Sequence, residues 1–81
     1  MPTTPQPLPD WLIDWRREVG DRVRRRREER GLSQEQLAGL LYAERRTIHR
    51  LEAGATSPPL DRILHIAHVL GVPPASLLPD E

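Results

Sequence analysis

Arg45, Arg46 and Arg50 fall within one short segment whose apolar residues recur at helical spacing. Ile48 and Leu51 share one face of such a helix, and at about 100° per residue the side chains of Arg46 and Arg50 point most directly away from them. A guanidinium group can donate two hydrogen bonds to guanine O6 and N7 in the major groove of DNA. Exposed arginines are also common on solvated helix faces, so position alone leaves both interpretations open.

Residues 31–54 predict two short helices around a tight turn. Ser33 is a good N-cap for the first helix, and Gln36 at the third helical position completes a capping box. The second helix is expected over 44–53, before a glycine that favours a helix end. This arrangement places the three arginines on the second helix.

The flanking residues predict further helices and no strands. A stripe of apolar residues from Trp11 predicts a long first helix that Asp10 can cap and that ends near Arg30. A fourth helix is expected over Leu60 to Leu70, and a short last helix should follow the prolines at 73 and 74. The core residues expected from this part are Leu60, Ile63, Leu64, Ala67, Val69, Leu70, Leu77 and Leu78.

The segments GDRVRRRREERGLS at 20–33, QEQLAGLLYAERRTIHRLEAG at 34–54 and IAHVLGV at 66–72 resemble the Cro-like phage-repressor helix-turn-helix family, also called the xenobiotic-response-element (XRE) type. The resemblance implies an all-α fold, a five-helix lambda-repressor-like domain, here with an N-terminal helical extension. Two positions depart from the family pattern: Tyr42 replaces the turn glycine, and Glu44 replaces a Ser or Asp. A tyrosine at positive φ is strained, so either the turn is remodelled or packing holds Tyr42 in place.

The resemblance implies a sequence-specific DNA-binding regulator, most often a repressor, that binds double-stranded DNA as a homodimer on a palindromic operator. It assigns Arg27 and Glu52 to an ion pair between the first helix and the recognition helix. Gln34 has no structural duty apparent from the sequence, which favours a phosphate contact. The residues implied to contact bases are Arg45, Arg46, His49 and Arg50. The residues implied to contact phosphates are Arg27, Ser33, Gln34, Thr47, Thr56 and Ser57, although Thr56 and Ser57 also suit an ordinary loop.

Trp11 and Trp15 precede the family match, and an exposed tryptophan pair would be a contact surface. They could cover the last helix around Leu77 and Leu78 or meet a second subunit. We favour the first as the direct contact, with the resulting hydrophobic end helping to build the dimer surface, and these four residues form a candidate dimer or partner surface. The competing hypothesis is therefore a protein-interaction module or an antitoxin-type component that binds a partner protein through this extension.

Composition bounds the remaining possibilities. The 81 residues predict a flexible proline-rich arm over 1–9 and a single helix-turn-helix domain over 10–81, with its core over 19–78. The absence of cysteine fits a reducing compartment, and no apolar run has membrane-spanning length, so we expect a cytoplasmic protein with no membrane partner. The net charge is zero, yet arginines outnumber acids between 16 and 56, which leaves room for a local positive field.

Enzymatic and metal-binding functions find little support in the sequence. His65 and His68 are three residues apart, but without another clustered ligand this is a weak metal signal. No nucleophile and base form a recognisable arrangement. We therefore expect neither catalysis nor a cofactor nor a bound metal.

Overall fold

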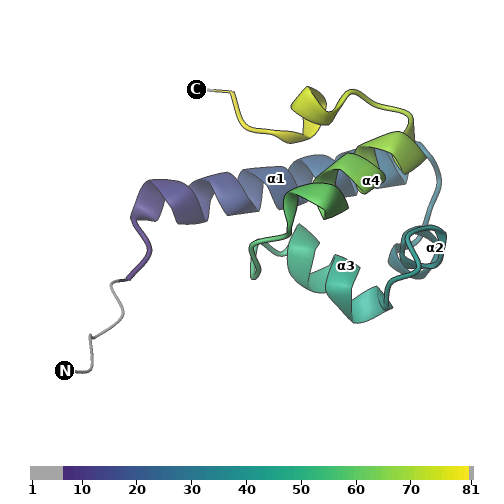
Figure 1. The fold of residues 1–81 in the computed structure, drawn as a ribbon, viewed down its shortest axis with the longest axis horizontal. Helices are drawn as coiled ribbons and strands as arrows, with labels where there is room; N and C mark the ends of the chain where they lie inside the picture. Colours follow the sequence, from purple (N-terminus) through teal and green to yellow (C-terminus); the bar gives the residue numbers. More distant parts are fainter. Residues whose placement is uncertain (1–6, 81) are drawn as a thin grey trace.

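The structure, a computed structural model, describes residues 7–80, and within them the chain forms helices joined by short turns, with no strand (Figure 1). The predicted arm over 1–9 therefore lies mostly outside the described residues, as does the last residue of the predicted domain. The elements are α1 (Asp10–Glu29), α2 (Gln34–Leu40), α3 (Arg45–Glu52), α4 (Leu60–Leu70) and the 3₁₀ helix η1 (Pro74–Leu77).

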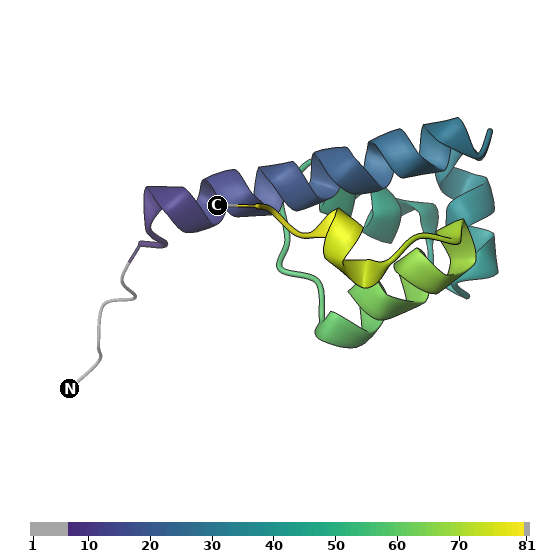
Figure 2. The same ribbon diagram turned by 90° about the horizontal axis from the view of Figure 1, so that it is seen from above.

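Helix α1 is the longest element, and its N-terminal part projects beyond the other helices (Figure 2). Its 20 residues correspond to a length of about 30 Å. Pro9 is the N-cap, so the prediction that Asp10 caps this helix is wrong: Asp10 is already its first residue. The carboxylate of Asp10 still lies in the first turn, where a negative charge complements the helix dipole.

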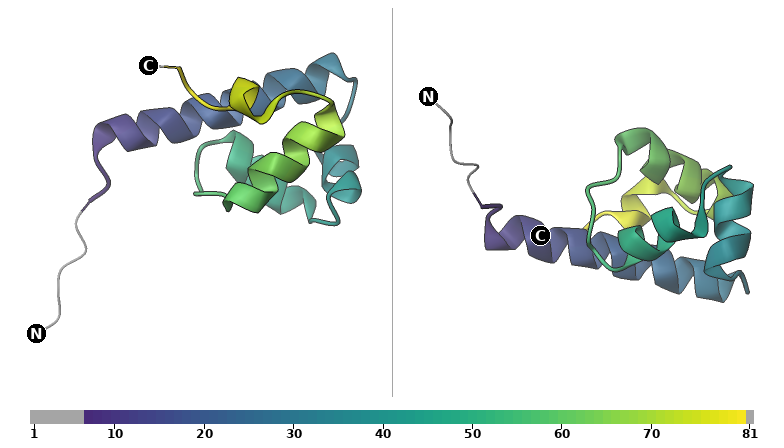
Figure 3. Two further views of the ribbon diagram at one scale, coloured as in Figure 1. Left: turned by 45° about the horizontal axis from the view of Figure 1, so that its top comes forward. Right: turned by 90° about the horizontal axis from the view of Figure 1, so that it is seen from below.

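Helices α2 and α3 form the predicted pair around a tight turn (Figure 3). The capping box is confirmed, because Ser33 Oγ accepts from the Gln36 amide at 3.0 Å and Gln36 Oε1 accepts from the Ser33 amide at 2.8 Å. Helix α3 agrees with the predicted span of 44–53. Tyr42 adopts a φ of 54° with its side chain 95% exposed, so the turn keeps left-handed geometry without side-chain packing to hold it.

The core lies between α1 and the other helices. On α4 the buried residues are Ile63, Ile66, Ala67 and Leu70, whose spacing of three and four places them on one face. Ile66 was missing from the predicted core and is fully buried. Leu60, Leu64 and Leu78 were predicted to be buried and are exposed: Leu64 falls outside this face, Leu60 is the first residue of α4, and Leu78 follows η1. The buried residues of the other elements are Gly20, Val23, Leu37, Ala38, Leu41, Ile48, Leu51 and Leu77.

The last element is a 3₁₀ helix where a fifth α-helix was expected. Its four residues follow Pro73, and the extended Leu78 precedes another proline, so the segment is too short for α-helical hydrogen bonding to propagate. The Pro73 carbonyl instead accepts from the Ser76 amide at 2.9 Å and from its hydroxyl at 2.6 Å. Helix α4 ends as predicted, at Gly71 with a φ of 69°. Among the described residues, no helix has the length and apolar character needed to cross a membrane.

Candidate nucleic-acid interface

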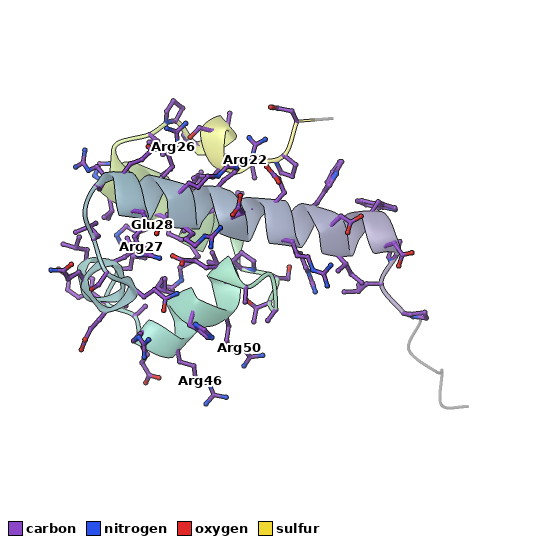
Figure 4. All side chains as sticks on the ribbon, turned by 180° about the vertical axis from the view of Figure 1, so that it is seen from behind. Arg22, Arg26, Arg27, Glu28, Arg46 and Arg50 are labelled. Atoms are coloured by element: carbon purple, nitrogen blue, oxygen red, sulfur yellow. The ribbon has the colours of Figure 1, made fainter. Side chains whose placement is uncertain are left out.

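The outer face of α3 carries the residues that the sequence singled out for base contacts. Arg45, Arg46, His49 and Arg50 are all exposed, while Ile48 on the opposite face is fully buried. Figure 4 shows Arg46 and Arg50 pointing away from α1, into solvent. Because a rigid helix presents these guanidinium groups outward, they are available to a ligand that lies along α3.

The arginines of α1 are in a different electrostatic situation. Arg22, Arg24, Arg25, Arg26 and Arg27 each form an ion pair with a carboxylate. Most of these pairs join residues three or four positions apart, where side chains are neighbours on the helix surface. Within residues 7–80, by contrast, no carboxylate pairs with an arginine of α3. Residues 22–27 of α1 are therefore compensated in charge, whereas the outer face of α3 presents three guanidinium groups without a carboxylate partner in the described part of the chain.

A polar network ties α3 to α1 and α2. Arg27 donates through Nε and Nη2 to the carboxylate of Glu52 at 2.7 and 2.9 Å, and through Nη1 to the Leu32 carbonyl at 2.8 Å. The side chains of Arg27 and Glu52 are only 11% and 3% exposed. The hydrogen bond to Glu52 raises the pKa of Arg27 above its ordinary value, so this guanidinium stays charged at neutral pH. The network fixes the orientation of α3 relative to α1.

Gln34 belongs to the same network. Its side-chain amide donates to Glu52 Oε1 at 3.1 Å, so the expectation that Gln34 has no structural duty is wrong. The sequence did not reveal this contact because the two residues lie on different helices. Ser33 is exposed at the start of α2, where its hydroxyl caps the helix.

The hydroxyl groups predicted to contact phosphates lie around one surface hollow. Thr47 from α3 and Thr56 and Ser57 from the following loop line it, together with Arg46, Arg50 and, from α4, Arg62. The sequence analysis overlooked Arg62, because only the tertiary fold brings the first turn of α4 to the same hollow as α3. His49 does not line this hollow; it lines a second one, together with Arg45 and Arg46.

The four residues of the predicted contact surface, two tryptophans and two leucines, do not form one continuous surface in the structure. Trp11 and Trp15 are 56% and 44% exposed, and their rings make an edge-to-face contact with centroids 5.2 Å apart. Trp15 and Leu78 line one apolar groove between α1, the start of α4 and the C-terminal segment. Leu77 is fully buried in the core, so its assignment to a contact surface is wrong. The apolar groove is also lined by Leu12, Arg16, Val19, Leu51, Pro58, Leu60, Ile63 and Pro79.

His65 and His68 are both exposed on α4. Among residues 7–80 they belong to no cluster of three or more potential metal ligands.

Comparison with known proteins agrees with this geometry. Residues 18–78 match the protein family described as "Helix-turn-helix domain". No curated protein sequence matches the chain. The chain is similar to the restriction-modification controller protein C.AhdI from Aeromonas hydrophila, with 34% identity, a TM-score of 0.79, and coverage of 86% of this chain and 100% of that one.

Two further structures show the same fold. The hypothetical transcription factor NHTF from Neisseria is 32% identical, with a TM-score of 0.78 and coverage of 95% of this chain and 87% of that one. Hydroxypropylphosphonic acid epoxidase from S. wedmorenis is 29% identical with a TM-score of 0.74, and the match covers 79% of this chain but only 34% of that protein. The family match and the two regulator structures, which cover nearly the whole length of both chains, agree with the exposed arginines of α3. The chain belongs to the helix-turn-helix family of DNA-binding transcription regulators, of the Cro-like, XRE type.

Proposed function

We propose that this chain is a sequence-specific transcriptional repressor that binds a palindromic DNA operator as a homodimer. The observation that carries the proposal is the contrast between two sets of arginines: the five within residues 22–27 of α1 are neutralised by ion pairs, and those of α3 are exposed and unpaired among the described residues. In the major groove, such arginines can read guanine by paired hydrogen bonds. The proposal requires no catalytic group, cofactor or metal.

Each part of the interface then has its own role. Arg45, Arg46, His49 and Arg50 would face base edges, while hydroxyl groups around α3 and the N-terminal end of α2 would contact phosphates and set the docking register. Arg27 would approach the DNA backbone with the N–H groups that its hydrogen bonds to Glu52 and to the Leu32 carbonyl leave free. In addition to Arg27, the residues that we propose to contact phosphates are Ser33, Gln34, Thr47, Thr56 and Ser57.

The second subunit would dock on the apolar groove and the projecting start of α1. A two-fold interface must be self-complementary, and this part of α1 carries Asp10 and Asp14 followed by Arg16 and Arg17. Two such segments packed antiparallel would place the acids of one beside the arginines of the other.

Similarity to a restriction-modification controller protein and to a transcription factor supports a regulatory role. The epoxidase similarity concerns about a third of that protein, and we propose no epoxidase activity for this chain. A second candidate function is a module that binds another protein through Trp11 and Trp15, which their exposure favours.

A gel-shift titration tests the proposal directly. The protein is titrated onto the DNA upstream of its own gene and onto a scrambled sequence, at low salt and at about 200 mM salt, because backbone contacts weaken steeply with salt. We expect a shift that is specific for the upstream DNA at both concentrations. The absence of a specific shift at either salt concentration, together with stable capture of a different protein, would favour the second candidate.

A further inference from the structure

Arg62 is half-buried in the hollow beside α3, and the roles assigned so far do not account for it. It lies in the first turn of α4, where the positive end of the helix dipole disfavours a cation. Within the described residues it forms no ion pair. No ion pair or side-chain hydrogen bond within the described chain compensates this unfavourable interaction of its guanidinium with the helix dipole.

Two more guanidinium groups line the same hollow. Arg46 and Arg50 come from α3, and they too lack a carboxylate partner within residues 7–80. Glu44 is the one acidic side chain in the lining. Three mutually repelling cations around one carboxylate leave a net positive hollow, which an anion would stabilise.

The remaining polar lining is suited to a tetrahedral oxyanion. Thr47, Thr56 and Ser57 supply hydroxyl donors from α3 and from the loop that follows it. The hollow is open to solvent and continuous with the outer face of α3, where Figure 4 shows Arg46 and Arg50 projecting. A duplex that lies along α3 would therefore bring its sugar-phosphate backbone to this opening.

We propose that the hollow binds one phosphate of the DNA backbone and that Arg62 is a DNA-contacting residue. This inference rests on the proposed function. It extends the interface beyond the two helices of the motif to α4, so that α2 and α4 would hold the duplex from either side of α3. The contact reads no base, and its contribution should be the same for any sequence.

The test substitutes Arg62→Ala in the full chain and measures affinity for the upstream DNA and for scrambled DNA over a series of salt concentrations. We expect affinity for both DNAs to fall about tenfold. The slope of the logarithm of the binding constant against the logarithm of the salt concentration should become smaller in magnitude by about one. Arg62→Lys, which keeps the charge, should keep the slope. The control is Arg25→Ala, which also removes one arginine charge. Arg25 lines a hollow beside η1 with Arg22 and Arg26, and Figure 4 shows these two on the side of α1 that faces away from α3. This substitution should leave DNA binding unchanged.

The outcomes separate this inference from the function on which it rests. If Arg46→Ala weakens binding while Arg62→Ala binds like the parent, the phosphate site is overturned and DNA binding stands. A lower melting temperature with an unchanged salt slope would make Arg62 merely structural and would also overturn the site. Saturable stabilisation by inorganic phosphate that Arg62→Ala abolishes, with DNA affinity unchanged, would assign the hollow to free phosphate instead. If the parent protein itself binds no DNA, both proposals fail.

Discussion

Arg46 and Arg50 project from α3 with no carboxylate to neutralise them in the described structure, so their loss should affect DNA binding and little else. Arg46→Ala and Arg50→Ala should each weaken specific binding by about 1–3 kcal/mol, the value of a bidentate guanine contact, and leave the thermal melt unchanged. Titrations on operator and scrambled DNA decide the role. An equal loss on both would indicate phosphate contact, and no loss would remove these residues from the interface.

Glu52 joins three helices through its bonds with Arg27 and Gln34, and its side chain is almost fully buried. Glu52→Ala should lower the free energy of unfolding by about 3–5 kcal/mol, because it leaves the guanidinium of Arg27 buried without a counter-charge, with only the Leu32 carbonyl as a partner. Replacing both charges, as in Arg27→Met with Glu52→Leu, should recover part of that loss. Urea melts that place Glu52→Ala within error of the parent would contradict this account.

Tyr42 holds a positive φ while its ring lies in solvent, so its backbone strain has no compensating contact within the described chain. Tyr42→Asn should raise the free energy of unfolding by about 0.5–1 kcal/mol, because asparagine tolerates the left-handed region far better than tyrosine. Tyr42→Ala is the matched control: it removes the ring but keeps the strain, and should give no gain. Equal urea midpoints for the asparagine and alanine variants would show that backbone strain is not the cause.

At the scale of the elements, α1 approaches the end of α3 closely enough to exclude any side chain at Gly20. A Cβ atom there would lie 2.5 Å from the carbonyl oxygens of Leu51 and Glu52, which are backbone atoms and cannot rotate away. Gly20→Ala should therefore destabilise the protein by about 1–3 kcal/mol, despite the higher helix propensity of alanine.

Gly39 on α2 is the control for Gly20, because a Cβ atom there would have no neighbour within 4 Å. Gly39→Ala should stabilise the protein by about 1 kcal/mol through helix propensity alone. Thermal melts of the two variants should move in opposite directions. A gain for both would mean that α1 and α3 can separate at little cost.

The ends of the helices were predictable where a local residue determines them. Ser33 with Gln36 marks the start of α2, and Gly71 marks the end of α4. The 3₁₀ form of η1 was missed because apolar spacing indicates which residues turn inward but not whether prolines leave room for a full α-helical turn. Leu60 and Leu64 were misplaced for a related reason, since the face that α4 buries depends on how it packs against α1 and η1.

In the candidate site, too, features set within one helix were predictable and features set by contacts between elements were not. Outward arginines on α3 follow from helical periodicity, and the structure places them as periodicity predicts. The bond from Gln34 to Glu52 and the position of Arg62 beside α3 depend on contacts between elements, and periodicity within one helix contains no information on them.

For the whole molecule, zero net charge and a positive recognition face are compatible because the arginines within residues 22–27 are paired with carboxylates, while those on the outer face of α3 have no such partner in the described chain. A neutral chain has little long-range attraction to the DNA polyanion, so most of its affinity must come from contacts made at the interface. Two copies that bind one operator would double those contacts. This makes the dimer surface the feature on which the affinity of the whole assembly depends.

Trp11 and Trp15 are the residues at which that surface can be tested. Substituting both by serine should weaken dimerisation in sedimentation experiments with little change in the fold, because both side chains are already substantially exposed. Two recognition helices must be held about 34 Å apart to read successive half-sites, so affinity for a full operator should fall more than affinity for a half-site. Leu40→Ser, an exposed apolar change on α2, should leave the oligomeric state unaltered. A double variant that sediments like the parent would assign the tryptophans to a different protein partner.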